Sequence, residues 1–116
     1  MPRDPRVYVE DIQEAIRRIG SYTSGLDFVA FAKNPMVIDA VVRNLEVLGE
    51  AAGRIPEELR AAAPEVEWRK IVALRNVLAH EYFGIHNKIV WDVIVDKLEP
   101  LEEACRQILK DLGPSA

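Results

Sequence analysis

The stretch NPMVIDAVVRNLEVLGEAAG, residues 34–53, decides the fold. Its apolar side chains recur every three or four residues, a spacing that places them along one face of a helix. They are Ile38, Val41, Val42, Leu45, Leu48 and Ala52. Asn34 can cap the first turn, and Pro35 suits the first helical position, where its missing N–H costs no hydrogen bond. We therefore expect a long amphipathic helix that runs from here through Gly53.

The sequence before this helix repeats the pattern. Asp4 and Pro5 again place a capping side chain before a proline, and the apolar residues that follow form a helical stripe. That stripe consists of Val9, Ile12, Ile16 and Ile19. Gly20 and the Ser and Thr residues near it are expected to end this helix, and residues 26–31 to add one or two helical turns.

The sequence after residue 53 predicts further helices. Pro56 starts a short helix that ends before Pro64, and a longer helix covers residues 65–82. The last segment begins near Asn87 and is interrupted by Pro100, which predicts a kink or two helices in series. No stretch alternates apolar and polar residues in the manner of a strand. We therefore expect an all-α, antiparallel bundle of four to five main helices.

Length and composition narrow the class of protein. The 116 residues suit a single domain over residues 1–116, and 49% hydrophobic residues exclude a disordered chain. No apolar run approaches the ~20 residues that a membrane-spanning helix needs, and the first residues do not resemble an export signal. Because Cys105 is the only cysteine, no internal disulfide is expected, and we predict a soluble, cytoplasmic protein. The net charge of −4 argues against a general nucleic-acid coating protein, so RNA would bind where a few arginines converge.

The segment Arg75-Asn76-Val77-Leu78-Ala79-His80-Glu81-Tyr82-Phe83 carries the candidate chemistry. On a helical wheel with Ile71 at zero, Arg75 falls at about 40°, inside a broad apolar arc. Because an arginine does not lose its charge, a carboxylate, a partner subunit or a phosphate must meet it there. Glu46 or Glu50 could be that carboxylate. The breadth of the arc also favours burial on two sides, one in the monomer and one in a homodimer.

Glu46 and Glu50 have a second interpretation, because they share one helical face with Arg43. The simplest expectation, which we favour, is an intrahelical charge network among the three side chains. In the functional alternative, one glutamate holds Arg75, or Arg43 helps to line an RNA cleft.

His80 is the candidate proton-transfer residue, since an imidazole titrates near neutral pH. On the wheel it lies about 140° from Arg75, so periodicity alone does not bring the two side chains together. Three arrangements would bring them to one phosphate: the long reach of Arg75, a distorted last turn of the helix, or pairing across a two-fold axis. The sequence does not distinguish among these. Taken alone, these residues favour a structural histidine and a salt-bridged arginine over catalysis.

The other reactive side chains indicate packing rather than chemistry. Cys105 lies on the apolar face of the last helix without a basic neighbour, so we expect it in the core. His86 follows a glycine-containing turn and is expected to be a capping or surface residue. The spacing of His80, His86 and Cys105 matches no zinc motif, and we predict no metal site. Trp68 and Trp91 are expected to anchor the core or a dimer.

The segment from Arg75 also resembles a known signature. Arg-Asn, two residues and then Ala-His-Glu-Tyr-Phe matches the Arg-x4-His-x-Tyr motif of HepT-like proteins, in the HEPN group of ribonucleases. Residues 42–52 resemble the second characteristic helix of that family, residues 64–69 its lead-in to the motif helix, and residues 89–92 its final segment. The resemblance spans roughly residues 8–112, with no departure in the core motif.

This resemblance implies a homodimeric, all-helical, HEPN-like endoribonuclease toxin that cuts RNA without a metal ion or cofactor. Its catalytic residues would be Arg75 and His80, at a cleft on the dimer axis, with Asn76 in a supporting role. Members of the family are encoded beside an MntA-type nucleotidyltransferase antitoxin, which attaches AMP to the motif tyrosine, Tyr82 in this chain. The residue types suit RNA cleavage by the 2′-hydroxyl, because His80 can transfer the proton and Arg75 can stabilise the phosphorane.

The alternative is a HEPN module without catalytic activity, which binds a nucleotidyltransferase as a scaffold or as a substrate-presenting subunit. The presence of both Arg75 and His80 favours the nuclease, since a scaffold would need neither. No local motif chooses between transfer RNA and messenger RNA as the substrate.

Overall fold

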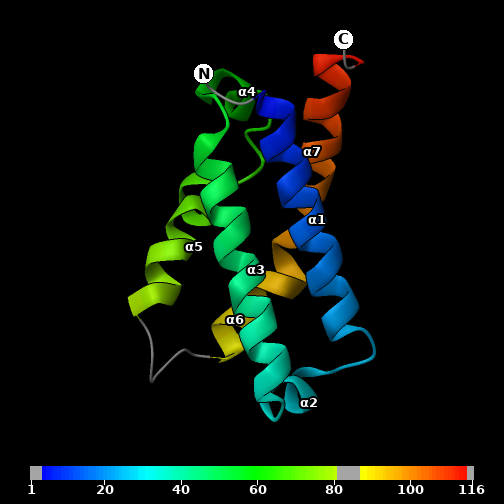
Figure 1. The fold of residues 1–116 in the computed structure, drawn as a ribbon, viewed down its shortest axis with the longest axis vertical. Helices are drawn as coiled ribbons and strands as arrows, with labels where there is room; N and C mark the ends of the chain where they lie inside the picture. The colour runs from blue at the N-terminus through cyan, green and yellow to red at the C-terminus, as the bar shows by residue number, and fades with distance from the viewer. Residues whose placement is uncertain (1–3, 81–86, 115–116) are drawn as a thin grey trace.

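The computed structural model describes residues 4–80 and 87–114, except for the side chains of Ala79 and His80. Within these residues all regular structure is α-helical, as predicted (Figure 1). The helices are α1 (Pro5–Thr23), α2 (Phe28–Ala32), α3 (Pro35–Arg54), α4 (Glu57–Ala61), α5 (Trp68–His80), α6 (Asn87–Asp96) and α7 (Leu98–Leu112).

The long helices form an antiparallel bundle, which confirms the predicted fold class. α1 and α3 make the most extensive contact, α5 packs on α3, and α7 packs on α1, with α6 leading directly into α7 (Figure 1). The two short helices, α2 and α4, lie at opposite ends of a molecule that measures 45 × 28 × 25 Å. None of the helices in the described part of the chain has the length and apolarity needed to cross a bilayer.

The predicted helix caps are present. The Asp4 carboxylate accepts a hydrogen bond from the Arg6 amide at 2.9 Å, and the Asn34 side chain accepts one from the Val37 amide at 3.2 Å. A proline follows each cap at the start of its helix. These local signals therefore fix where α1 and α3 begin.

The first helix ends in the predicted region, within the Ser and Thr residues that follow Gly20 rather than at Gly20 itself. α1 continues to Thr23, whose hydroxyl donates a hydrogen bond to the Ile19 carbonyl at 2.8 Å. The chain turns at Gly25, which has a φ of 78°. Only glycine adopts that conformation at little cost, so Gly25, rather than Gly20, marks the turn.

The motif helix begins at Trp68 and not at residue 65. Residues 64–67 form a turn, and the Trp68 indole N–H donates a hydrogen bond to the Ala63 carbonyl at 3.0 Å. The predicted end of this helix at residue 82 lies outside the described residues.

The interruption predicted from Pro100 is confirmed as two helices in series, although the break comes earlier, at Lys97. A proline ring clashes with the carbonyl four residues before it, which here belongs to Asp96, the last residue of α6. Pro100 itself lies in the first turn of α7, where its missing N–H costs nothing. The Lys97 ammonium also pairs with Glu67 at 2.8 Å and so ties this junction to the start of α5.

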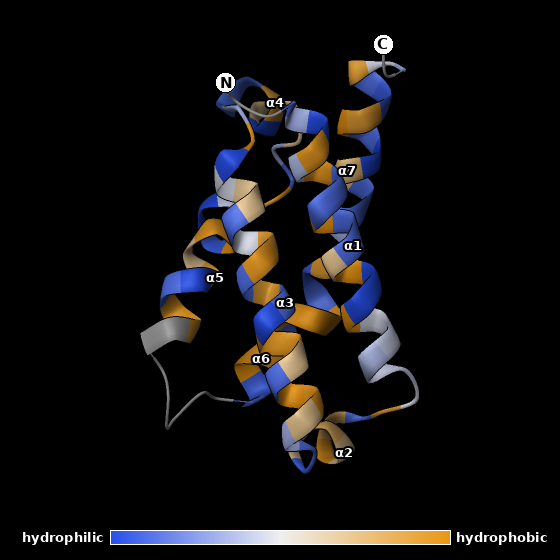
Figure 2. Cartoon of the chain, viewed as in Figure 1, coloured by the Kyte–Doolittle hydropathy of each residue, from blue (hydrophilic) through white to orange (hydrophobic). Residues whose placement is uncertain are grey.

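The core is built from aliphatic side chains on the facing stripes of the long helices (Figure 2). Its largest fully buried members are Phe31, Ile12, Ile19, Leu45, Leu48, Ile55, Leu101, Ile108, Val9, Val41, Val90 and Cys105. Burial raises the pKa of the Cys105 thiol to about 12, with a smaller contribution from the charge of Glu102. The prediction that Cys105 packs in the core is confirmed.

Both tryptophans anchor the bundle. The Trp91 ring lies 5.1 Å from the Phe31 ring and 6.4 Å from the Phe28 ring, which fixes α6 against α2. Trp68 is buried, with 9% of its surface exposed to solvent. Their expected role in the core is confirmed for the single chain.

α5 packs on α3 by one flank, and its other flank borders an apolar groove shared with α6. The groove has a volume of about 350 Å³ and is lined in part by Ile71, Leu74, Val77, Ile89 and Val93. Val77 is 48% exposed and Ile89 is 52% exposed. The broad apolar arc predicted for this helix is therefore present, and the flank turned away from α3 is open to solvent.

Candidate active site on helices α3 and α5

The two helices that carry the candidate residues approach each other at two glycines of α3. A Cβ on Gly49 would lie 3.0 Å from the Ile71 carbonyl oxygen and 3.5 Å from the Arg75 amide nitrogen. One turn further on, a Cβ on Gly53 would lie 3.5 Å from a methyl carbon of Val72. Because Gly49 has no side chain, α3 reaches the backbone of α5 at the position of Arg75.

Arg75 does not lie in the apolar core, so the expectation from the helical wheel is wrong on this point. Its side chain is 60% exposed and pairs with the Glu50 carboxylate, 43% exposed, through Nη1 at 2.5 Å. The reason is that α5 lies at the edge of the bundle, and the long Arg75 side chain extends from the arc along the surface of α3. The expectation that a carboxylate meets Arg75, and that Glu50 could be that carboxylate, is confirmed.

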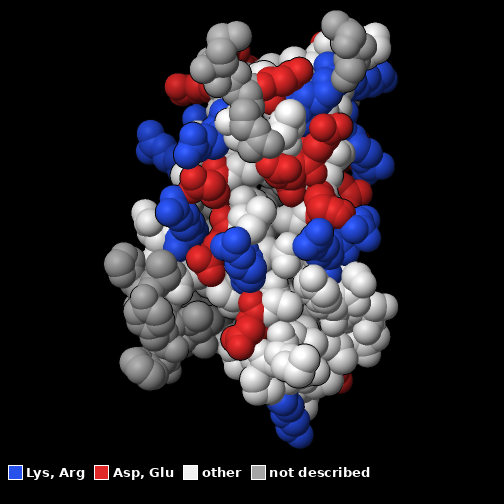
Figure 3. Space-filling model, viewed as in Figure 1, with Lys and Arg blue, Asp and Glu red and all other residues white. Residues whose placement is uncertain are grey.

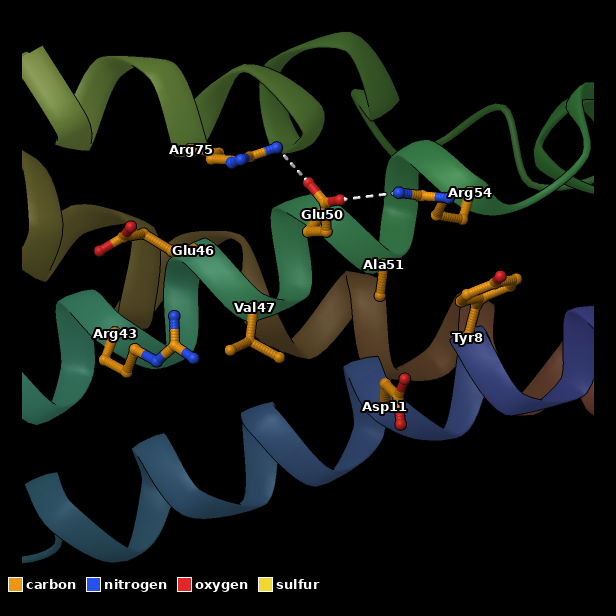
Figure 4. Close-up of a pocket in the computed structure, with 9 residues that line it drawn as sticks. All are labelled: Tyr8, Asp11, Arg43, Glu46, Val47, Glu50, Ala51, Arg54 and Arg75. Carbon is orange, nitrogen blue, oxygen red and sulfur yellow. Dashed lines mark hydrogen bonds and ion pairs between the residues drawn. The ribbon is translucent and has the colours of Figure 1, made fainter. Parts of the chain in front are cut away.

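Glu50 holds a second arginine, Arg54, one turn later on its own helix. The Arg54 Nη2 lies 3.2 Å from Glu50 Oε1, whereas Arg75 uses Oε2, so each carboxylate oxygen has its own partner (Figure 4). The network that we favoured among Arg43, Glu46 and Glu50 does not form. Within residues 4–80 and 87–114, neither Arg43 nor Glu46 makes an ion pair.

These side chains line a hollow on the surface between α1, α3 and α5. It has a volume of about 500 Å³, and three arginines face it from two helices: Arg43, Arg54 and Arg75 (Figure 4). Asp11, Glu46 and Glu50 lie among them, and Tyr8 closes one end. Positive and negative side chains alternate over this part of the surface rather than forming a field of one sign (Figure 3).

A smaller hollow next to it brings in Asn76. This hollow, with a volume of about 210 Å³, is lined by residues that include Arg75, Asn76, Glu50 and Arg54. Arg75 and Asn76, both expected at the site, are thus exposed together at the crossing of α3 and α5. Such a position leaves hydrogen-bond donors of both side chains available to a ligand from solvent.

The remaining motif residues are placed only in part. His80 is the last residue of α5, and its side chain is not described. Tyr82 and His86 lie outside the described residues. The encounter of His80 with Arg75 and the position of Tyr82 therefore stay predictions.

The exposed arginines determine what this surface can do chemically. A guanidinium keeps its charge at every physiological pH and presents forked donors that match a phosphate. An ion pair as exposed as that of Glu50 and Arg75 contributes at most about 1 kcal/mol to folding, so an anionic ligand can compete for the guanidinium. In the described part of the chain, no group of three His, Cys, Asp or Glu side chains is arranged to hold a metal ion.

The sequence reasoning missed two contributors to this geometry, Gly49 and Arg54. The available signal for the first was the pair Gly49 and Gly53, spaced by four residues inside a helix, where glycine is costly unless another backbone comes close. Arg54 stands four residues after Glu50, which is the spacing of a helical ion pair. The helix was expected to end at Gly53, however, which is one residue before Arg54.

Comparison with known proteins places the chain among ribonuclease-like sequences. A family model described as "Ribonuclease HepT-like" matches residues 12–108. "Putative RNase MJ0127" of Methanocaldococcus jannaschii is 36% identical over 113 residues, which cover 97% of this chain and 93% of that protein. "Putative RNase TTE0752" of Caldanaerobacter subterraneus subsp. tengcongensis is 35% identical over 108 residues, 93% of this chain and 96% of that protein.

A third relative carries the family name itself. "Probable ribonuclease HepT" of Thermococcus cleftensis is 33% identical over 110 residues, which cover 95% of this chain and 100% of that protein. No solved structure matches the chain significantly.

Proposed function

We propose, because this chain belongs to the HepT-like ribonuclease family, that it is a metal-independent endoribonuclease toxin with Arg75 and His80 as its catalytic residues. The observation that carries the proposal is the exposure of Arg75 beside Asn76 at a surface hollow. Its Nε and Nη2 donors have no hydrogen-bond partner among the described residues, so they are available to a phosphate.

The proposed reaction uses the nucleophile that RNA itself contains. His80 removes the proton of the 2′-hydroxyl, O2′ attacks the adjacent phosphorus, and the bond from phosphorus to O5′ breaks. The leaving O5′ takes a proton from a second imidazole, which the other subunit of a homodimer would supply. Arg75 stabilises the charge that builds on the phosphate oxygens, and Asn76 orients the phosphate or the histidine. The products are a 2′,3′-cyclic phosphate and a 5′-hydroxyl.

The homodimer is part of this proposal. The open groove between α5 and α6, with Val77 and Ile89 each about half exposed, offers an apolar surface of the kind that a second subunit covers. The groove lies on the flank of α5 turned away from Glu50, so the second imidazole would have to reach the phosphate around the end of this helix, where His80 stands. Two copies of the motif helix would then lie near the two-fold axis.

Control by a partner completes the proposed role. An MntA-type nucleotidyltransferase would act as the antitoxin by attaching AMP to Tyr82. Each AMP group adds bulk and negative charge near Arg75, where it competes with the phosphate of RNA and repels it.

The proposal is tested by cleavage of RNA by the purified protein in the presence of EDTA. We expect cleavage with 2′,3′-cyclic phosphate ends, which falls by about 10²- to 10³-fold in Arg75→Ala and by about 10²- to 10⁴-fold in His80→Ala. The matched controls are Arg69→Ala, an exposed arginine of the same helix, and His86→Ala, the other histidine. Loss of activity in EDTA, or products with a 3′-hydroxyl, would contradict the mechanism.

The toxin role has its own test, expression of the chain in cells without a partner. Growth arrest that disappears with His80→Ala supports the toxin. Harmless expression of a folded wild-type protein would instead favour a HEPN module that only binds the nucleotidyltransferase.

A further inference from the structure

Glu50 stands at the centre of the charged groups around the hollow. One of its carboxylate oxygens accepts from Arg75 on α5, and the other accepts from Arg54 on its own helix (Figure 4). Arg54 thus restrains the Glu50 carboxylate through one oxygen, and the carboxylate holds Arg75 through the other. Glu46, one turn earlier on α3, lines the same hollow but makes no ion pair with any residue that the structure describes.

The contact with Glu50 uses only one nitrogen of the Arg75 guanidinium. Nη1 donates to Glu50, whereas Nε and Nη2 have no hydrogen-bond partner among the described residues. A guanidinium has five N–H donors in a fixed plane, so anchoring one nitrogen sets the direction of the rest. The backbone of Arg75 is fixed as well, because Gly49 brings α3 against its amide.

Stability does not account for this arrangement. The Arg75 side chain is 60% exposed and that of Glu50 is 43% exposed, and ion pairs this open to solvent contribute little to folding. What the contact does restrict is the rotation of a long, flexible side chain, which otherwise loses conformational freedom only when the ligand binds.

We propose that Glu50 is a positioning residue, which holds Arg75 by Nη1 and directs Nε and Nη2 toward the phosphate of the RNA substrate. This inference rests on the proposed function and extends it to a residue outside the motif. Glu50 lowers the cost of ordering Arg75 in the transition state, but its negative charge does not help RNA to bind. Removing Glu50 therefore slows cleavage without weakening the binding of RNA.

The kinetic test compares Glu50→Met with Glu10→Met, a change at an exposed glutamate of α1 outside the hollow. Methionine keeps the helix propensity of glutamate and offers no charged acceptor, so the helix is preserved in each variant. We expect the single-turnover rate of Glu50→Met to fall about tenfold while its Kd for RNA stays equal or decreases. Glu50→Gln, which keeps an acceptor oxygen, should recover part of the rate, and Glu10→Met should keep all of it. An unchanged rate in Glu50→Met, or a loss that appears only as a raised Kd, would overturn the inference.

A second measurement separates this inference from the proposed function. The ¹⁵N resonances of the arginine side chains, with Arg75 assigned by its loss in Arg75→Lys, report how fast its guanidinium rotates in the protein without RNA. Slow rotation in the wild type that becomes fast in Glu50→Met supports the anchor, and unchanged rotation would overturn it. A wild-type protein that cuts no RNA would contradict the proposed function, and the rotation would still decide whether Glu50 holds Arg75.

Discussion

Gly49 and Ile71 set the distance between α3 and α5. A Cβ on Gly49 would come within 3.0 Å of the Ile71 carbonyl oxygen, an atom that cannot move unless the backbone of α5 moves with it. The Arg75 amide nitrogen is the next nearest atom, at 3.5 Å. The same close approach thus places the backbone of the candidate catalytic arginine beside Glu50.

Gly49→Ala should therefore destabilise the protein, whereas Gly53→Ala should stabilise it. Alanine favours a helix over glycine by about 1 kcal/mol, but at residue 49 overpacking against a backbone costs about 1–3 kcal/mol. At residue 53 the new Cβ makes only ordinary contact with the Val72 side chain. Thermal unfolding should show a lower Tm for the first variant and a Tm about 4 °C higher for the second.

RNA cleavage by the same two variants gives a further check. Gly49→Ala should lose activity beyond its loss of stability, because Arg75 moves with the backbone of α5. Equal activity of the two variants at a temperature where both are folded would show that the crossing of α3 and α5 does not set the site.

The second prediction concerns pH and the carboxylate of Glu67. The pKa of Glu67 is lowered from 4.5 to about 2. The largest cause is a hydrogen bond from Lys70, followed by one from Lys97 and by the positive charges of both side chains. Since the folded pKa lies below the unfolded one, this stabilisation is complete above about pH 4.5 and is lost as the pH falls toward 2. Glu67→Gln should therefore lower the Tm at pH 7, and the difference from the wild type should shrink in acid.

Salt supplies the control for this prediction. Because these groups are exposed, the Tm difference at pH 7 should also decrease at high ionic strength. Glu65→Gln, a nearby exposed carboxylate without an ion pair in the described part of the chain, should show neither dependence. A Tm difference that is the same at pH 2 and pH 7 would mean that packing, rather than charge, is responsible.

Much of the fold follows from local signals in the sequence. The caps at Asp4 and Asn34 act within three residues of themselves, so the starts of α1 and α3 were predictable. The end of α1 was predictable only to within a few residues, because a helix interior tolerates Gly20 and the decisive property of Gly25 is its positive φ. The break at Lys97 could be placed only roughly, since Pro100 acts on a carbonyl four residues away.

The candidate site depends on how α3 and α5 cross, and a helical wheel drawn for one helix holds no information about that crossing. The wheel placed Arg75 in the apolar arc, but the exposure of its side chain depends on where α3 crosses α5. The charge of Arg75 did predict a partner, and Glu50 was one of two candidates. The choice between Glu46 and Glu50 required the register of the two helices, which Gly49 sets.

The third prediction addresses control by the partner. Tyr82→Phe removes the hydroxyl that would accept AMP and leaves the aromatic ring. We expect a nuclease that stays toxic when the nucleotidyltransferase is co-expressed, whereas the wild type and Tyr22→Phe, an exposed tyrosine of α1, are silenced. Intact-mass measurements should show added AMP only in the last two proteins. Full inhibition of Tyr82→Phe would indicate control by tight binding rather than by modification.

The last prediction uses Cys105 to report on the integrity of the core. Burial raises the pKa of its thiol to about 12 from the usual 9.0, and the side chain is 0% exposed. At pH 8 the shift in pKa alone lowers the thiolate fraction by about 10³-fold, and the surrounding core also excludes the reagent. Native protein should therefore resist iodoacetamide, and urea should release a single fast-reacting thiol. Alkylation that proceeds at the same rate with and without urea would mean that α7 does not stay packed on α1, since Cys105 reacts only when that contact opens.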